Sequence, residues 1–240
     1  MLLANKTAVV YGGGGAIGSV VARAFAREGA HVFLAGRTRQ ALDAVANTIR
    51  TSGGTADVAT VDALDRAAVE AHAAAVGRTT GGIDIVFNAT SNDDVQGATL
   101  ADTSYDDVMR PIIKAVTAQY VIATTVAAHM KARRTGVILV MAGGREAIPA
   151  LGGAHVAWSA LAGLCRQLAC ELGPDGIRVA WLLSPGSPAD DNADPLAEAT
   201  MLNRRPTLSD VANVAVFVSS DWADTMTATE INITGGAVVD

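Results

Sequence analysis

Closely spaced glycines form the segment of this chain that is best suited to binding a charged group, Tyr11-Gly12-Gly13-Gly14-Gly15-Ala16-Ile17-Gly18. A β-branched run precedes the segment and an alanine-rich run follows it, so it joins a predicted strand to a predicted helix. Small residues at such a junction let backbone N–H groups approach a pyrophosphate, and the helix N-terminus adds a favourable potential. A plain turn is the alternative, but this position favours a nucleotide site. We expect contacts from Gly12, Gly14, Gly15, Ala16 and Ile17.

The end of the second predicted strand indicates which dinucleotide would bind. An acidic residue at this point would hold the 2′-hydroxyl of the adenosine ribose in NAD. The chain has Gly36 there, followed by Arg37 and Thr38. A missing carboxylate and a nearby guanidinium suit a 2′-phosphate, so Arg37 and Thr38 predict NADP(H) rather than NAD(H) as the cofactor. A solvated basic turn is the alternative interpretation.

Polar residues that could act on a substrate are few along the rest of the chain. Residues 92–94 (Asn-Asp-Asp) follow the fourth predicted strand, and Arg145 and Glu146 follow the fifth, at the edge where such sheets bind ligands. A solvated turn is the simplest interpretation of the first group, and a mutual ion pair that of the second. His155 is a candidate acid–base group, although a lone histidine is more often structural. No nucleophile–base set and no metal-ligand spacing is visible.

Short β-branched runs alternate with alanine-rich helical stretches along the whole chain. Strands are predicted at 6–11, 31–36, 56–61, 83–88, 136–142, 177–184 and 229–233. Helices are predicted at 16–28, 38–52, 65–76, 103–132, 152–173 and 208–220. This alternation indicates a three-layer, doubly wound, Rossmann-type α/β fold with a parallel sheet of about seven strands. No linker or repeat divides residues 1–240, which predicts a single domain, and the unpatterned stretch 185–206 predicts a substrate lid.

Composition and charge argue against several classes of protein. The formal net charge of -6 argues against a nucleic-acid partner. No apolar run approaches the roughly 18 residues of a membrane span, so no membrane association is expected. The first predicted strand begins too early to leave room for a signal peptide. Cys165 and Cys170 are expected to be reduced and buried, which favours a cytoplasmic protein.

Several motifs from end to end of the chain match one pattern. The spacing Gly12-x-x-x-Ala16-Ile17-Gly18 is followed by Val61-Asp62-Ala63, by Asn88-Ala89, and by Glu171-Leu172-Gly173-Pro174-Asp175-Gly176-Ile177-Arg178-Val179. Pro185-Gly186 and Ile231-Asn232-Ile233-Thr234-Gly235-Gly236 complete the set. Together they resemble the short-chain dehydrogenase/reductase family, with Ala16 for a motif glycine and one asparagine retained of two. The resemblance implies a small-molecule substrate and further cofactor contacts from Asp62, Ala63, Asn88, Ala89, Pro185 and Gly186.

The resemblance also indicates which catalytic side chains this chain lacks. The family uses a Tyr and a Lys four residues apart on one helix, and the matching positions are Ala154 and Trp158. The polarising Ser of the preceding strand matches Gly143, and the Asn that completes the proton relay matches Ile112. No Tyr or Lys occurs beyond Lys131, so a shift of register does not restore the pair. The identity of any catalytic residue is therefore unknown from the sequence.

These losses leave three interpretations of function. Hydride transfer to a carbonyl builds an alkoxide that needs a proton or a positive partner. The first interpretation is an NADP(H)-dependent oxidoreductase of atypical mechanism, for which activated C=C or iminium acceptors need less protonation at oxygen. The second is a catalytically inactive dinucleotide-binding protein, a sensor or a partner subunit. The third is a non-redox lyase or cyclase that uses the emptied pocket. Trp158 would stack on a ligand ring, block the pocket or pack against the sheet.

The predicted helix at 152–173 also indicates self-association. Leucines and a cysteine recur at helical spacing, and alanines broaden the apolar surface beyond one stripe. One face must cover the sheet, and the remainder needs another partner. The resemblance implies that this helix and the one at 103–132 pair across a twofold axis, and contacts through these helices and the C-terminal strand predict a homotetramer.

Overall fold

The computed structural model describes residues 1–184 and 200–239. Within them, strands form one sheet in the order β3-β2-β1-β4-β5-β6-β7, and each neighbouring pair is parallel. The strands are β1 (Thr7–Tyr11), β2 (His31–Gly36), β3 (Thr55–Thr60), β4 (Ile85–Asn88), β5 (Gly136–Ala142), β6 (Ile177–Leu183) and β7 (Thr229–Asn232). The predicted Rossmann-type α/β fold is thus confirmed. The strand order changes direction between β1 and β4, the point at which such sheets bind ligands.

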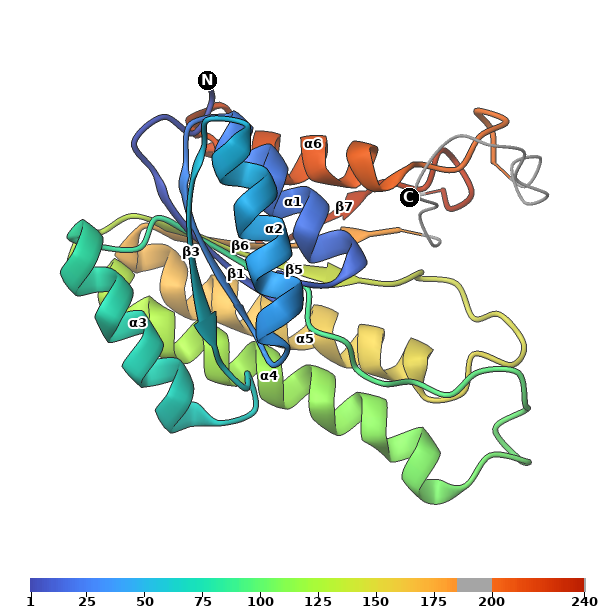
Figure 1. Cartoon of the computed structure of the whole chain (residues 1–240). Helices are drawn as coiled ribbons and strands as arrows, with labels where there is room; N and C mark the ends of the chain where they lie inside the picture. The colour runs from blue at the N-terminus through green and yellow to red at the C-terminus, as the bar shows by residue number, and fades with distance from the viewer. Residues whose placement is uncertain (185–199, 240) are drawn as a thin grey trace.

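Helices cover both faces of the sheet (Figure 1). One layer holds α1 (Ala16–Arg27), α2 (Arg39–Thr51) and α6 (Leu208–Ser219), and the other holds α3 (Arg66–Thr80), α4 (Tyr105–Lys131) and α5 (Ala154–Leu172). Short 3-10 helices lie at η1 (Gly173–Asp175) and η3 (Asp221–Ala223). The predicted bounds agree within a few residues. The largest difference is α3, which runs on from residue 76 to Thr80, where Gly81 ends it in a left-handed conformation.

Two hydrophobic cores separate the sheet from its helical layers. Along β1, Val9 and Tyr11 pack toward α3, α4 and α5, while Ala8 and Val10 pack toward α1 and α6, and all four are buried. Because helices cover both faces of the sheet, the strands are continuous runs of apolar residues and do not alternate between apolar and polar residues. Burial of each large aliphatic side chain contributes about 1.5–3 kcal/mol to folding, so these layers fix the strand ends that carry the site.

Helix α4 is long and apolar enough to cross a membrane by composition, although charged and polar residues interrupt its apolar sequence. In this fold it is a core helix. Ala118, Ile122 and Val126 are buried in the cluster that α4 shares with α3, α5 and the sheet, and more than half of its most apolar stretch is enclosed. Figure 1 shows α4 lying beneath the sheet beside α5.

The two cysteines lie on different faces of α5. Cys165 is buried beneath the sheet, and Cys170 is exposed. The expectation of two buried thiols is therefore right for Cys165 and wrong for Cys170, because five residues on a helix turn the side chain away from the core. Both thiols are free. Burial raises the pKa of the Cys165 thiol to about 12, so it stays protonated and unreactive.

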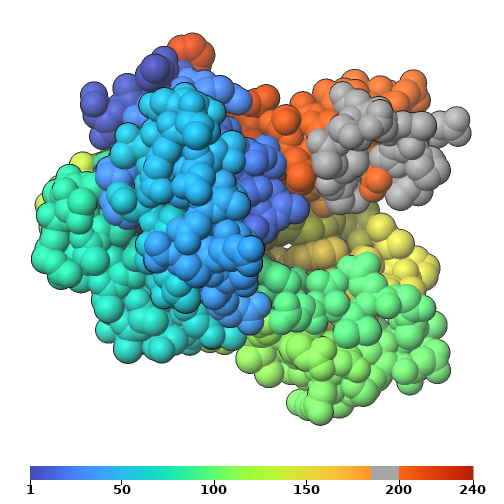
Figure 2. Space-filling view, in the orientation of Figure 1, coloured from blue at the N-terminus to red at the C-terminus, as the bar shows by residue number. Residues whose placement is uncertain are grey.

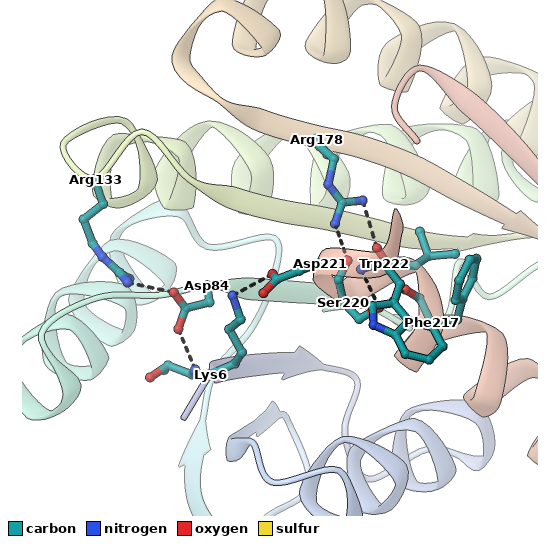
Figure 3. A network of polar contacts seen from close by, with 10 residues as sticks. Lys6, Asp84, Arg133, Arg178, Phe217, Ser220, Asp221 and Trp222 are labelled. Carbon is teal, nitrogen blue, oxygen red and sulfur yellow. Dashed lines mark hydrogen bonds and ion pairs between the residues drawn. The ribbon is translucent and has the colours of Figure 1, made fainter. Parts of the chain in front are cut away.

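A polar network joins the starts of the strands, at the end of the sheet away from the glycine loop (Figure 3). Lys6 Nζ lies 2.9 Å from Asp221 Oδ1, and Arg133 lies 2.8 Å from Asp84 Oδ1. The guanidinium of Arg178 donates hydrogen bonds to three backbone carbonyls at and after the end of α6. Because these charged groups are engaged with one another or with the backbone, we assign the network to the scaffold.

Candidate functional site

The glycine loop packs closely against the end of β4. Gly12 has φ +76°, and a Cβ at this residue would lie 2.4 Å from the backbone oxygen of Ala89. A Cβ on Gly18 would lie 2.2 Å from the oxygen of Gly12. Only glycine fits these two positions. The first turn of α1 is thereby held beside the strand ends, with Gly15 as its N-cap and no side-chain hydrogen bond that caps the helix.

A cavity of about 310 Å³ opens beside this loop. Figure 2 shows the same face of the molecule hollowed between the blue α1–α2 region and the green chain that leads into α4. Eight of the predicted cofactor residues line the cavity, namely Gly12, Gly14, Gly15, Arg37, Thr38, Asp62, Ala63 and Ala89. Ala16, Ile17 and Asn88 lie next to it outside its lining, and Pro185 and Gly186 lie outside the described residues.

Arg37 is available to a ligand and Arg39 is not. Arg39 begins α2 and binds Asp43 one turn later, with Nε 2.9 Å from Oδ2. Arg37 lines the cavity and makes no hydrogen bond or ion pair with any residue that the structure describes. Its neighbour Thr38 is the N-cap of α2, and its side chain makes no capping hydrogen bond. A guanidinium and a hydroxyl are therefore both uncommitted on one wall of the cavity.

The adjacent part of the cavity wall follows β3. Asp62 Oδ1 accepts a hydrogen bond from the backbone N–H of Leu64 at 3.0 Å, which shapes the turn before α3. Val61 and Ala63 flank it, and both are buried. These residues place one carboxylate and several apolar groups at the cavity, a combination that suits the edge and the face of a heterocyclic base.

Tyr11 and His72 form a neutral pair beneath the cavity. Tyr11 ends β1 and lines the cavity with a side chain only 1% exposed, and its hydroxyl lies 3.3 Å from Nδ1 of His72 on α3. Burial raises the pKa of the Tyr11 phenol and lowers the pKa of His72 to about 4. Both groups are thus uncharged near neutral pH. The pair accounts for the large side chain at the end of β1 without an acid–base role.

Asn88 anchors the end of β4. Its Nδ2 donates to Gln119 Oε1 at 3.0 Å, and its Oδ1 accepts from the N–H and the hydroxyl of Thr90 at 3.0 and 2.8 Å. Asn88 and Gln119 are both buried. The amide thus shapes the turn that carries Thr90 and Ser91 into the cavity wall.

Sequence reasoning missed Lys114. This residue lies on α4, lines the cavity near Ser91, and forms an ion pair with Asp93. The sequence favoured a solvated turn for residues 92–94, and the structure corrects this for Asp93. One feature of the sequence could have indicated Lys114: it is a lysine among apolar residues of the helix that became α4, two residues beyond Ile112.

The positions that the sequence resemblance predicts for the family's catalytic residues hold apolar groups. Ala154 is the buried first residue of α5, and Ile112 is partly buried on α4. The indole of Trp158 lies against the backbone of Gly143, where an added Cβ would come within 2.1 Å of Trp158 Cε2. Next to it, Gly144 faces open space. No hydroxyl, ammonium or amide stands at any of the four positions.

The other candidate groups near this edge differ in their surroundings. Arg145 Nε donates to Glu230 Oε1 at 2.8 Å, instead of pairing with Glu146 as the sequence suggested. Trp181 Nε1 donates to the second oxygen of Glu230 at 2.7 Å. His155 Nδ1 is enclosed and has no hydrogen-bond partner in the described part of the chain, so nothing there orients its ring for proton transfer.

Comparisons with known proteins agree on one family. Residues 14–238 match a family model described as enoyl-(acyl carrier protein) reductase. The chain is 31% identical to an uncharacterized oxidoreductase of Mycobacterium tuberculosis, over 98% of this chain and 92% of that protein. It is 29% identical to a short-chain reductase of Streptomyces niveus, over 97% and 94% of the two chains.

Solved structures show the same fold. A short-chain type dehydrogenase/reductase from Mycobacterium ulcerans superposes with a TM-score of 0.91 at 24% identity, covering 99% of this chain and 91% of that one. An NAD+-bound xylitol dehydrogenase superposes with a TM-score of 0.87 at 25% identity, covering 98% and 100%. The chain therefore belongs to the short-chain dehydrogenase/reductase family of oxidoreductases, whose members bind nicotinamide dinucleotides.

Proposed function

We propose that this chain is an NADP(H)-dependent oxidoreductase that works without the usual proton-transfer residues of its family. The observation that carries the cofactor preference is the uncommitted guanidinium of Arg37 on the cavity wall, next to Gly36 and Thr38. A carboxylate in place of Gly36 would select the free ribose hydroxyl of NAD. A charge-assisted hydrogen bond contributes about 1.5–3 kcal/mol, or roughly ten- to hundredfold in affinity.

The residues present fit a dinucleotide. Gly12 and Gly18 leave no room for side chains, so backbone groups form the surface that a pyrophosphate would meet. Asp62 and Ala63 line the cavity and would contact the adenine, and Thr38 adds a hydroxyl beside Arg37. The cofactor would supply a hydride donor or acceptor, and this chain's own groups would bind and orient it.

The choice of substrate follows from the missing acid. Ala154, Trp158 and Gly143 offer no proton and no positive charge to a developing alkoxide. An activated C=C or an iminium group is a better acceptor, because its reduction places less charge on an oxygen that the protein must protonate. The enoyl-reductase description of the matching family model supports this class of substrate.

A second candidate is a dinucleotide-binding protein without catalysis, acting as a sensor or a partner subunit. The contact between Trp158 and Gly143 favours it, because an indole fills space where the family places a serine and a lysine. Such a protein would retain the cavity and its affinity for the dinucleotide while reducing nothing.

A panel of acceptors followed at the nicotinamide absorbance separates the two candidates. We expect NADPH oxidation with α,β-unsaturated carbonyl compounds or cyclic iminium ions, and no turnover with simple ketones at rates typical of the family. Parallel reactions with NADH report the cofactor preference. Rapid reduction of simple ketones would overturn the proposed chemistry, and tight NADPH binding with no turnover on any acceptor would leave the sensor as the function.

We also propose a cytoplasmic homotetramer. Apolar side chains stand exposed on α4, with Ile113 57% exposed and Tyr120 49%, and Val156 is exposed on the neighbouring α5. On the other side, Trp222 of η3 is 78% exposed beside Phe217 of α6. Two separate apolar patches suit two different twofold contacts, which generate four copies.

A further inference from the structure

Asp93 is held in an uncommon backbone conformation that directs its carboxylate. Its φ is +54°, in the left-handed region that Asp tolerates better than most residues. Ser91 fixes it from two sides, because Ser91 Oγ accepts from the Asp93 N–H at 3.1 Å and donates to Asp93 Oδ1 at 2.9 Å. The second oxygen, Oδ2, is then free to bind the ammonium group of Lys114.

Lys114 belongs to the dinucleotide cavity. It lines the cavity together with Ser91 and Ala118, and its side chain is 18% exposed. Arg37 and Lys114 are the two cationic side chains among the residues that line this cavity. Hydrogen bonds from Lys114 and Ser91 lower the pKa of Asp93, and the charge of Arg37 lowers it further. Asp93 thus stays ionised and lies within electrostatic range of both cations.

We propose that Lys114 and Asp93 form a charge clasp that sets how strongly the cavity favours a dinucleotide with an additional phosphate. Lys114 raises the affinity for the 2′-phosphate, and Asp93 lowers it by neutralising Lys114 and opposing Arg37. This inference rests on the proposed function, since it assumes that a dinucleotide occupies the cavity. Cofactor preference would then depend on Lys114 of α4 and Asp93 of the β4–α4 segment as well as on Arg37 after β2.

The clasp acts through space, so its effect depends on the charge of the ligand. A 2′-phosphate adds up to two negative charges to a dinucleotide whose other groups are unchanged. At separations near one Debye length, about 8 Å at physiological salt, a single charge in a partly buried cavity changes affinity by roughly three- to tenfold. Both dinucleotides carry the charges of the pyrophosphate, so NADPH, which has the additional phosphate, should respond to the clasp more strongly than NADH.

Calorimetric titrations of NADPH and NADH into three variants test the clasp. Lys114→Met removes the ammonium and keeps the length of the side chain, and should weaken NADPH binding roughly three- to tenfold. Asp93→Asn keeps the shape and tolerates the same backbone conformation, and should strengthen NADPH binding by a similar factor. The double variant should bind NADPH with a dissociation constant close to that of wild type. The NADH dissociation constant should change in the same direction but by a smaller factor, so the ratio of the two dissociation constants should shift.

Matched controls come from an ion pair that lies away from the cavity. Lys131 Nζ is 3.0 Å from Asp175 Oδ2, between the end of α4 and η1. Lys131→Met and Asp175→Asn should leave both dissociation constants unchanged. Lys114→Arg should retain the wild-type preference, because the charge remains. Thermal unfolding of every variant shows whether the fold is intact.

A purely structural pair gives a different result. Lys114→Met and Asp93→Asn would then both lower the melting temperature and leave the ratio of the two dissociation constants unchanged, and this result would overturn the clasp. If the wild type prefers NADPH and loses that preference in Arg37→Ala alone, the clasp fails and the proposed cofactor stands. If the wild type binds neither dinucleotide, or both equally, the proposed cofactor preference and the clasp fall together.

Discussion

Trp158 and Gly143 are matched in shape, because the indole ring lies where a side chain at residue 143 would stand. A Cβ built on Gly143 would approach three ring atoms of Trp158 to within 2.1–2.3 Å. The sequence resemblance predicts that these two residues stand at the positions of the Lys and the Ser of the family's catalytic set. The indole at 158 thus leaves no room for a side chain at 143, and the pair forms a packed apolar wall.

The matched shape predicts a stability effect for Gly143→Ser. The added side chain must displace the indole, and overpacking of this kind costs typically 1–3 kcal/mol. Gly144→Ser is the matched control, because nothing lies within 4 Å of a Cβ at that residue. Urea unfolding should show a clearly lower free energy of unfolding for Gly143→Ser and little change for Gly144→Ser. Equal stability of the two serine variants would mean that Trp158 does not occupy this space in solution.

Restoring the family's residues should restore its chemistry. The triple variant Gly143→Ser, Ala154→Tyr, Trp158→Lys removes the indole and supplies the acid, the polariser and the ammonium. We expect ketone reduction with NADPH to rise by at least about 10²-fold, the lower range for a positioned general acid. Trp158→Lys alone, without the tyrosine, is the control and should stay inactive. No gain in the triple variant would show that the site differs from its relatives in more than these residues.

The buried His72 predicts a pH-dependent stability. Its pKa is about 4 in the folded chain and about 6.5 when unfolded. The unfolded state therefore binds more protons between these values, so stability is fully present above about pH 6.5 and falls as the pH drops toward 4. Protonation of this residue in the unfolded state should lower the free energy of unfolding by about 2 kcal/mol between pH 7 and pH 5. Urea unfolding of wild type and His72→Leu at both pH values measures this change in the free energy of unfolding. If the variant lost as much stability as wild type between the two pH values, His72 would be ruled out as the source.

The exposed apolar patches predict self-association. Light scattering should give a mass near four times the 24.4 kDa of the chain. Trp222→Asp, which places a charge in one patch, should reduce this mass by half while leaving the fold intact. A wild-type mass equal to that of a single chain at micromolar concentration would contradict the tetramer.

The fold could be predicted from the sequence because its signals are local and repeated. Apolar runs predicted β1 and β4, and glycines predicted the turn beside them, so the parallel sheet and a nucleotide site at the glycine loop could be predicted, whereas the strand order came only from the structure. The pairs that shape the site could not be predicted, because they join residues far apart in the chain. Asp93 meets Lys114 across 21 residues and Arg145 meets Glu230 across 85, and only the packed sheet brings them together. Residues 185–199 lie outside the described residues, so the lid at 185–206 stays a prediction.

The central claim is that Arg37 selects a dinucleotide by its 2′-phosphate, and one calorimetric experiment tests it most directly. NADPH and NADH are titrated into wild type, Arg37→Ala and Arg39→Ala at the same ionic strength. Arg39 is the matched control, because its guanidinium is already bound to Asp43. We predict tighter binding of NADPH than NADH by wild type, a loss of about tenfold or more for NADPH in Arg37→Ala, and no change in Arg39→Ala. Equal affinity of wild type for the two dinucleotides, or no binding of either, would contradict the account.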